Sequence, residues 1–208
     1  MAQFYQIHPV NPQKRLIEQV ADKIRRGGVV VFPTDSAYAI GCHLGDKAAV
    51  DRIRRIRQVD DKHHMTLICR DLSELGTYAK VDDNRCFRLI KSHVPGPYTF
   101  LLKATKGVPK RLAHPKRKTI GLRIPDNAII QAILEELGEP LMSSTLILPG
   151  SDDALSDPDE IRDRLDDQVD LIVDGGGCAP NPTTIIDLYS GEPIILRKGL
   201  GEVDDVFF

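Results

Sequence analysis

The sequence contains no tryptophan and only four cysteines in 208 residues. Cys42, Cys69, Cys86 and Cys178 lie far apart, without a C-x-x-C pair or a Cys/His spacing typical of metal sites. This pattern argues against a disulfide framework and favours free thiols in a reducing compartment. The sequence also lacks the roughly 20-residue apolar run of a membrane span, and its N-terminal segment has no apolar signal core. We therefore expect a cytoplasmic protein with no membrane partner.

Several motifs of common enzyme classes are also missing. The sequence contains no G-x-x-x-x-G-K-[ST], no G-x-S-x-G and no H-E-x-x-H. Gly175–Gly177 follows a predicted strand but lacks the following helix that a dinucleotide fingerprint requires. His63 and His64 are adjacent and point to opposite sides of an extended segment, so we expect no metal ion there. These absences argue against ordinary NTPases, dehydrogenases and hydrolases.

The net charge of −2 conceals an uneven distribution. Residues 1–123 contain 24 Lys and Arg against 11 Asp and Glu, whereas residues 124–208 contain 4 against 19. If the two halves form separate surfaces, the basic one favours an anionic ligand such as a nucleotide or nucleic acid. If they interleave in space, their charges neutralise each other. The sequence alone leaves both interpretations open.

Helices and strands alternate in the first half of the sequence, and the end is richer in strands. Asn11 and Pro12 indicate the start of a helix that Gly27 ends. This order predicts an α/β protein with a twisted mixed sheet, partly parallel and partly antiparallel, and flanking helices. No linker divides residues 1–208, so we expect a single domain. The other expected helices contain residues 46–56, 87–94, 127–137 and 158–165, and the expected strands are 29–32, 65–69, 98–104, 119–124, 140–148, 169–174, 185–189 and 193–197.

The segment VVVFPTDSAYAIGC joins a strand-like apolar run to polar residues. Thr34, Asp35, Ser36 and Tyr38 follow the strand, and the carboxyl ends of strands are where α/β sheets usually bind ligands. Short hydroxyls at this place are suited to a small polar substrate. The alternative is a turn that satisfies only its own backbone.

Two basic segments predict contact with phosphate groups. One is a predicted helix with Arg52, Arg54, Arg55 and Arg57, and the other is the loop of residues 106–118, which has no acidic residue. Such segments attract an RNA backbone, although both are also common as solvated surface. The loop has no aromatic residue for base stacking, so we expect weak sequence specificity. The candidate RNA-binding residues are Arg52, Arg54, Lys110, Arg111, Lys116, Arg117 and Lys118.

Six motifs, in this order, carry a resemblance to a known family: FPTDSAYAIGC, PGPYTFLL, IGLRIPDN, PLMSS, PTTIIDL and IILRKG. Together they resemble the YrdC/YciO family of threonylcarbamoyl-AMP synthases, and its YciO branch most. The resemblance implies a YrdC-like sheet around a large, concave, electropositive cleft. Family synthases convert L-threonine, bicarbonate and ATP into threonylcarbamoyl-adenylate, which serves t6A modification of tRNA at adenosine 37. The family is also described as binding double-stranded RNA.

The resemblance also implies roles for individual residues. It places Thr34, Thr66, Arg123, Ser144 and Thr184 at the amino-acid substrate. It places Arg55, Arg57 and Arg197 at the nucleotide, and Lys62, from a segment (residues 58–65) that is longer here than in the family, is a further candidate for that site. It assigns no catalytic residue. It implies no tightly bound cofactor, with Mg²⁺ arriving on ATP, and we expect no DNA partner.

At two positions the sequence departs from the family pattern. Arg55 replaces the lysine of the family's K-x-R element, and Leu146 replaces the asparagine of its S-x-N element. We therefore expect a protein that binds nucleotide, tRNA or double-stranded RNA in a basic cleft, with reduced synthase chemistry. One alternative is a weak or altered threonylcarbamoyl-adenylate synthase or hydrolase. Another is a non-catalytic RNA-binding protein.

Overall fold

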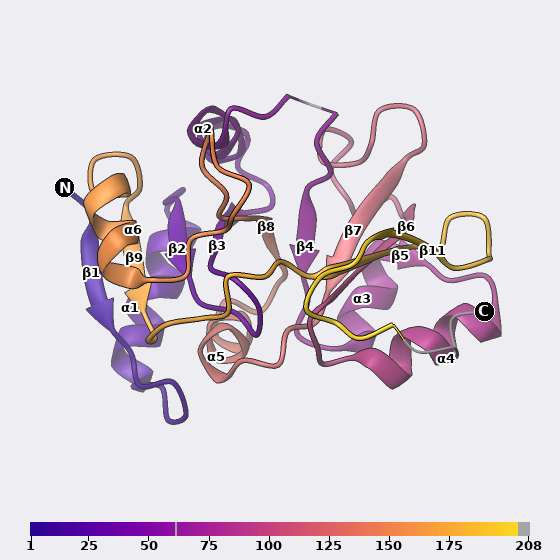
Figure 1. Ribbon diagram of the computed structural model, residues 1–208, viewed down its shortest axis with the longest axis horizontal. Coiled ribbons are helices and arrows are strands. Elements are labelled where there is room, and N and C mark those ends of the chain that lie inside the picture. The colour runs from indigo at the N-terminus through magenta and orange to yellow at the C-terminus, as the bar shows by residue number, and fades with distance from the viewer. Residues whose placement is uncertain (61, 204–208) are drawn as a thin grey trace.

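The structure, a computed structural model, describes residues 1–60 and 62–203. In these residues a single sheet contains eleven strands, and six helices surround it (Figure 1). The helices are α1 (Lys14–Arg25), α2 (Lys47–Arg57), α3 (Leu72–Tyr78), α4 (Asn84–His93), α5 (Ala128–Leu137) and α6 (Pro158–Leu165). The strands are β1 (Gln3–Gln6), β2 (Val30–Phe32), β3 (Ala39–His43), β4 (Thr66–Ile68), β5 (Ala79–Lys80), β6 (Tyr98–Ala104), β7 (Thr119–Arg123), β8 (Leu141–Thr145), β9 (Leu171–Asp174), β10 (Thr184–Asp187) and β11 (Ile194–Arg197).

The sheet combines parallel and antiparallel pairs. Its strands follow the order β1-β9-β2-β3-β8-β4-β7-β6-β10-β11, and β5 pairs with β6. The parallel pairs are β1 with β9, β2 with β9, β4 with β7, and β6 with β10. This arrangement confirms the predicted α/β fold with a mixed sheet.

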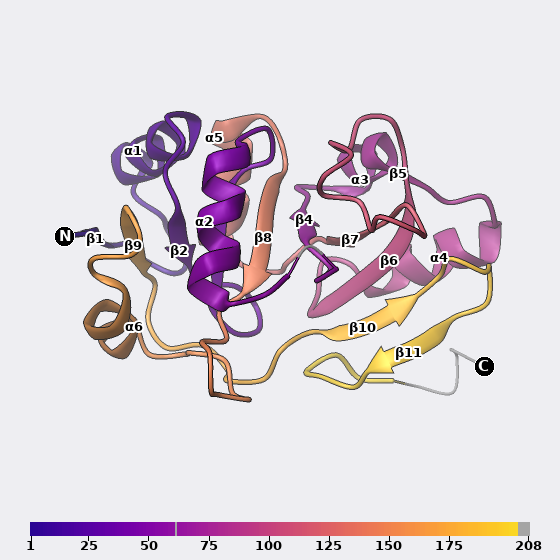
Figure 2. The same cartoon turned by 90° about the horizontal axis from the view of Figure 1, so that it is seen from above.

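Helices cover the two faces of the sheet unequally. Ile17 of α1 and Ile133 of α5 belong to one apolar cluster, whereas Ile53 of α2 packs in the other. Figure 1 shows α2 above the sheet and α5 below it. The view from above in Figure 2 shows that α2 lies over β3 and β8, and that no helix among the described residues covers the same face of β6 and β10. This uncovered face is where a ligand can reach the sheet.

Short polar side chains begin most of the helices, as the sequence predicts. Asp46 accepts a hydrogen bond from Ala49 N at 2.9 Å at the start of α2, and Asn127 and Asp157 cap α5 and α6 in the same way. These caps satisfy backbone N–H groups that have no partner inside the helix.

The predicted start of the first helix at Pro12 is wrong, because α1 begins at Lys14. The backbone N–H groups of Val10 and Asn11 donate to His8 Nδ1 at 3.2 and 3.0 Å. A turn held by this imidazole therefore occupies the residues where the cap was expected.

The polar segment of residues 33–38 connects two antiparallel strands. β2 pairs with β3, and Val31 lies opposite Ile40. β3 and the short elements β1, α3 and β5 were not predicted from the sequence. The connection nevertheless lies at the end of the buried strand β2, where the polar side chains were expected.

The basic and acidic halves of the sequence interleave in space. Ion pairs join Arg52 to Asp170 and Arg117 to Asp187, each at 2.7 Å. His43 also lies 2.6 Å from Glu139 across the same division. The two halves therefore neutralise each other in part, and any electropositive surface must be identified locally.

None of the helices that the structure describes has the length and apolar character needed to span a lipid bilayer.

Candidate functional site

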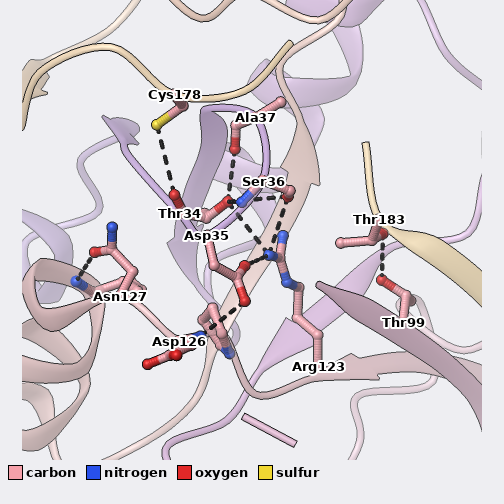
Figure 3. Close-up of polar contacts among 12 residues, drawn as sticks. Thr34, Asp35, Ser36, Ala37, Thr99, Arg123, Asp126, Asn127, Cys178 and Thr183 are labelled. Atoms are coloured by element: carbon pink, nitrogen blue, oxygen red, sulfur yellow. Dashed lines mark hydrogen bonds and ion pairs between the residues drawn. The ribbon is translucent and has the colours of Figure 1, made fainter. Parts of the chain in front are cut away.

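The segment of residues 33–38 folds around the guanidinium of Arg123 (Figure 3). Arg123 Nη2 donates to Asp35 Oδ1 at 2.5 Å, to Ser36 Oγ at 3.2 Å and to Thr34 Oγ1 at 3.3 Å. The second carboxylate oxygen of Asp35 accepts from Asp126 N at 2.8 Å. The side chains of Arg123 and Asp35 are only 5% and 8% exposed. This is a buried ion pair in which both carboxylate oxygens have partners.

The hydroxyl of Thr34 is used inside the same cluster. It donates to Ala37 O at 2.7 Å and accepts from Ser36 N at 3.1 Å. Burial lowers the pKa of Arg123 and the charge of Asp35 opposes that shift, so the guanidinium stays protonated. The Thr34 hydroxyl and the Asp35 carboxylate are therefore satisfied within the cluster, whereas Arg123 Nε is buried and has no hydrogen-bond partner among the described residues.

A cavity of about 170 Å³ lies next to this cluster. Two guanidiniums, two imidazoles and five hydroxyl groups line it, and the described lining residues include no carboxylate. The described residues that line it are Arg57, His63, His64, Thr66, Thr99, Leu101, Ser144, Thr145, Ile147, Thr183, Ile185, Leu196 and Arg197. Its lining is therefore positively charged and rich in neutral hydrogen-bonding groups.

Arg57, His63 and Ser144 form a hydrogen-bonded triangle on one wall. Arg57 Nη1 donates to Ser144 Oγ and lies 3.0 Å from His63 Nε2, and Arg57 Nε donates to Ile147 O at 3.2 Å. His63 Nε2 is also 3.3 Å from Ser144 Oγ. Because a guanidinium can only donate, Nε2 is the unprotonated nitrogen of the His63 ring. The imidazole is therefore a neutral acceptor with its proton on Nδ1.

The charges around the cavity repel one another. Burial, with a smaller contribution from the charge of Arg57, lowers the pKa of His63 to about 4. Burial and the charge of Arg197 lower the pKa of Arg57 to about 10. Burial and the charge of Arg123 lower the pKa of Arg197 as well. At neutral pH, His63 is uncharged and the two lining guanidiniums remain cationic.

A bulge in β11 directs Arg197 into the cavity. The register of β11 against β10 shifts between Ile185 and Ile186, and Leu196 and Arg197 both line the cavity although they are consecutive. In a regular strand, consecutive side chains point to opposite faces, and a bulge removes that alternation. Arg197 Nη2 then donates to Thr183 O at 2.9 Å and to Thr183 Oγ1 at 3.3 Å.

The opposite wall has a pair of hydroxyl groups. Thr183 Oγ1 lies 2.8 Å from Thr99 Oγ1 of β6, and Figure 3 shows the pair together with Arg123. Both residues line the cavity. The arrangement can hold an anion between guanidiniums while hydroxyls orient the polar groups attached to it.

Comparison with known proteins identifies the family. Residues 22–199 match the Sua5/YciO/YrdC family, which is described as "Telomere recombination". The chain belongs to this family. Two relatives within it are YciO of Escherichia coli K12, 58% identical over 98% of both chains, and a protein of Haemophilus influenzae, 55% identical over 97% of both.

Solved structures within the Sua5/YciO/YrdC family have the same fold. The crystal structure of E. coli YciO has a TM-score of 0.96 and covers 100% of both chains at 57% identity. Sua5 of P. abyssi, solved in complex with L-threonine, has a TM-score of 0.87 at 24% identity. That similarity covers 94% of this chain and 57% of the Sua5 chain, and at this identity it shows the fold.

The structure brings together four of the site residues that the family motifs predict. Arg57, Thr66, Ser144 and Arg197 line the same cavity. Thr34 and Arg123 form the buried cluster beside it. The motifs gave no indication of the neutral His63, which comes from the segment that is longer here than in the family.

Three predicted residues lie elsewhere. Thr184 is 0% exposed, donates to Gly201 O at 2.6 Å and accepts from Gly199 N at 2.9 Å, and its neighbour Thr183 lines the cavity instead. Arg55 and Lys62 are exposed, and neither is among the described lining residues. The alternation of extended residues explains the first difference, because Thr183 immediately precedes β10 and points to the opposite face from Thr184, the first residue of that strand.

The position of Leu146 also has a structural explanation. Leu146 is 0% exposed and belongs to the apolar core. Its backbone N–H donates to Tyr38 O at 2.9 Å. The side chain that replaces the family asparagine thus packs inside the protein and cannot donate a hydrogen bond.

The predicted RNA-binding arginines are engaged within the protein. Arg52 pairs with Asp170 at 2.7 Å, and Arg117 pairs with Asp187 at the same distance. Arg54 lies 3.6 Å from Asp51 and donates to Arg111 O at 3.3 Å. Arg111 itself donates to Leu44 O and Gly45 O.

The lysines of the loop 106–118 are exposed instead. Lys106, Lys110, Lys116 and Lys118 all lie at the surface. The Nζ atom of Lys118 donates only to a backbone carbonyl, that of Pro115, at 2.7 Å. Within the described residues, no group of three or more His, Cys, Asp or Glu is placed to hold a metal ion.

Proposed function

We propose that the cavity binds the negatively charged groups of a nucleotide or of a ligand like threonylcarbamoyl-adenylate. The observation that carries the proposal is that Arg57 and Arg197 share one cavity whose described lining has no carboxylate. Two cations held close together lower each other's pKa, and an anion bound between them relieves their repulsion. Guanidiniums bind phosphate and carboxylate through paired hydrogen bonds, which adds geometric selectivity.

The size of the cavity suggests which part of the ligand it takes. Pockets for drug-sized ligands measure about 300–1,000 Å³, so a cavity of about 170 Å³ fits an amino acid or a phosphate group better than a whole nucleotide. Sua5 of P. abyssi, a protein of the same fold, was solved with L-threonine. We infer that the threonine-like part lies at Thr66, Ser144 and Thr183, with phosphate at Arg57 and Arg197.

An adenylate-forming reaction is compatible with these groups. Threonine and bicarbonate would first form the carbamate N-carboxythreonine with loss of water, and a carbamate oxygen would then attack the α-phosphorus of ATP, forming an O–P bond while the bond to pyrophosphate breaks. Arg57 and Arg197 would offset the charge on the phosphates, and the hydroxyls would position the amino acid. The described lining has no carboxylate to hold Mg²⁺, so the ion would belong to the ATP substrate.

The rate of this reaction is expected to be low. The resemblance puts an asparagine of family synthases at position 146, where the side chain of Leu146 packs in the core and outside the described lining of the cavity. A donor lost at a reacting centre costs about 10²-fold in rate, and we infer that this chain lacks that donor. Binding with slow or altered adenylate chemistry is therefore the version that these residues support best.

Calorimetric titration and product analysis test the proposal. ATP, AMP and L-threonine are titrated into the protein and into Arg197→Met, with Arg162→Met as a control for an exposed arginine distant from the cavity. We expect micromolar to millimolar binding that Arg197→Met weakens and the control does not. Incubation with ATP, threonine and bicarbonate then measures pyrophosphate and adenylate. If no ligand of the three binds, the proposal fails.

A second candidate function is binding of structured RNA. It is supported by the four exposed lysines Lys106, Lys110, Lys116 and Lys118 in a loop that contains no acidic residue. When binding depends on lysine–phosphate contacts, the logarithm of the affinity falls linearly with the logarithm of the salt concentration.

Charge reversal of these four lysines tests the second candidate. Arg117 is left intact because it pairs with the buried Asp187. We expect the plot of log affinity for tRNA against log salt concentration to become less steep. The change should correspond to the loss of up to about four phosphate contacts. Reversal of four lysines elsewhere, at Lys14, Lys23, Lys47 and Lys91, is the control. An equal change in both variants would remove the loop as the contact.

A further inference from the structure

Two cations lie close to the ring of Tyr189, which follows β10 in the sequence. The Arg117 Cζ atom is 4.6 Å from the centroid of its ring, and the Lys103 Nζ atom is 5.3 Å away. The ring is partly buried. Arg117 is held in place by Asp187, whose side chain is 5% exposed, at 2.7 Å. The ring and one of its cations are therefore fixed by the protein.

A second pair of like charges lies next to this ring. Lys80 of β5 is directly opposite Lys103 of β6, and both are exposed. Like charges directly opposite in an antiparallel pair are destabilising. Lys80, Lys103 and Tyr189 line the same small cavity of about 140 Å³, whose lining also includes Asp82 and Asp83.

The acidic residues of this lining balance only part of its positive charge. Asp83 is already used, since it accepts from Arg85 N at 2.7 Å and pairs with the Arg85 side chain at 3.0 Å. Asp82 is exposed and offsets one of the two lysine charges, and the charge of Arg117 is balanced by Asp187. Lys80, Lys103, Arg117 and Tyr189, here named the distal cluster, thus combine one aromatic ring with two exposed lysines and one paired arginine.

The distal cluster continues the face of the sheet that lines the candidate site. Thr99 and Leu101 of β6 line the larger cavity, and Lys103 is the next residue of β6 on that face because strand side chains alternate. At about 3.4 Å per residue, the cluster lies roughly 14 Å from Thr99 along the strand. The exposed lysines of the loop 106–118 belong to the connection between β6 and β7.

We propose that Tyr189 is a stacking platform for an unpaired base of an RNA strand whose phosphates contact Lys80, Lys103 and the loop lysines. A cationic track combined with an aromatic ring is how proteins bind single-stranded nucleic acid, the ring taking the base and the cations taking the backbone. The entering base displaces the ammonium of Lys103, the more distant cation, which then pairs with phosphate. The inference rests on the second candidate function and adds that the RNA is bound at an unpaired segment.

The absence of tryptophan allows a direct optical test. Tyr189→Trp contains a single tryptophan, and a base stacked on an indole quenches its fluorescence. Phe4→Trp is the matched control, because Phe4 also has an arginine over its ring, Arg162 at 4.8 Å, beside the acidic helix α6. The probes are a single-stranded oligoadenylate, an abasic ribose-phosphate strand of equal length and an RNA duplex.

The expected result is quenching of Tyr189→Trp by oligoadenylate and not by the abasic strand, with no quenching of Phe4→Trp. Tyr189→Leu should lower the affinity for oligoadenylate about tenfold, and Tyr189→Phe should keep it. The salt slope should remain unchanged in both variants, because the phosphate contacts remain.

Three outcomes would overturn the inference. If oligoadenylate binds with a steep salt slope but Tyr189→Leu binds as well as Tyr189→Phe, the second candidate function stands and the stacking platform does not. The same follows if the duplex binds and quenches as strongly as the single strand. If no RNA binds at all, both fail together. Thermal unfolding of each variant confirms that the fold is intact.

Discussion

Two groups of arginine side chains lie at the candidate site, and they differ in what balances their charge. Arg123 has the carboxylate of Asp35 at 2.5 Å. Arg57 and Arg197 have backbone carbonyls, hydroxyls and a neutral imidazole as partners. The family motifs assign all three arginines to one site. In the structure, Arg123 forms a neutralised pair with Asp35, whereas Arg57 and Arg197 line an electropositive cavity. A buried arginine therefore indicates a ligand site only when its counter-ion is missing.

The largest expected effect comes from breaking the neutralised pair. Asp35→Asn leaves the Arg123 guanidinium buried without a charge partner, which costs about 3–5 kcal/mol of the free energy of unfolding. Urea denaturation measures this, with Asp22→Asn, which loses an exposed pair with Arg25, as the control. A loss below about 1 kcal/mol would show that Asp35 does not balance Arg123.

The opposite result is expected in the cavity. Arg197→Met removes a charge that repels Arg57, so the free energy of unfolding without ligand should not fall. Affinity for ATP should drop by about 1.5–3 kcal/mol, which is about tenfold to a hundredfold, because a hydrogen bond to a charged group is lost. Denaturation and calorimetry on the same preparation separate the two effects. If Arg197→Met loses stability and keeps its affinity for ATP, Arg197 has the structural role that is expected here of the Asp35–Arg123 pair.

The neutral imidazole predicts a pH dependence of stability. The pKa of His63 is about 4 in the folded protein and 6.5 when unfolded, so the unfolded state binds more protons between these values. Stability is therefore complete above pH 6.5 and declines as the pH falls toward 4. The full shift corresponds to about 3 kcal/mol, which partial exposure reduces to about 1–2 kcal/mol.

His63→Gln retains a hydrogen-bond acceptor and cannot titrate. The difference in unfolding free energy between pH 7 and pH 4.5 should be smaller in His63→Gln than in the unchanged protein. Equal pH dependence in the two proteins would show that His63 is already protonated or is not buried.

The smallest effect is expected at Arg55. The family motif assigns it to the nucleotide, but it is exposed and absent from the described lining of the cavity. Arg55→Ala should change the affinity for ATP less than twofold and the stability by less than about 0.5 kcal/mol. A tenfold loss of affinity for ATP would show that Arg55 contacts the nucleotide and that the site extends beyond the cavity.

Local patterns were sufficient to predict most elements of the fold. Helix caps at Asp46 and Asn127 and the buried strand β2 follow from residue type and spacing alone. The helix α3 carried a readable signal as well: Asp71 accepts from Glu74 N at 2.9 Å and Glu74 accepts from Arg70 N at 2.6 Å. β3 had no such signal, because no change of residue type marks the point where the polar segment of residues 33–38 ends and the strand begins.

The site was predictable only as far as its motifs reach. The family motifs predicted Arg57, Ser144 and Arg197 as site residues, and these three line one cavity in the structure. The choice of Thr183 over Thr184 depends on which face of the sheet each side chain points to at the start of β10, and the bulge in β11 that admits Arg197 depends on pairing between strands. Neither feature is encoded in a motif of a few residues.

Stability measured against ligand concentration tests the central claim most directly. At constant ionic strength, the free energy of unfolding is measured at increasing ATP concentrations for the unchanged protein and for Arg197→Met. A ligand that binds only the folded state adds about 1.4 kcal/mol for each tenfold increase above its Kd. We predict that rise in the unchanged protein, and a rise displaced to at least tenfold higher ATP in Arg197→Met. Superimposable curves for the two proteins would contradict the account.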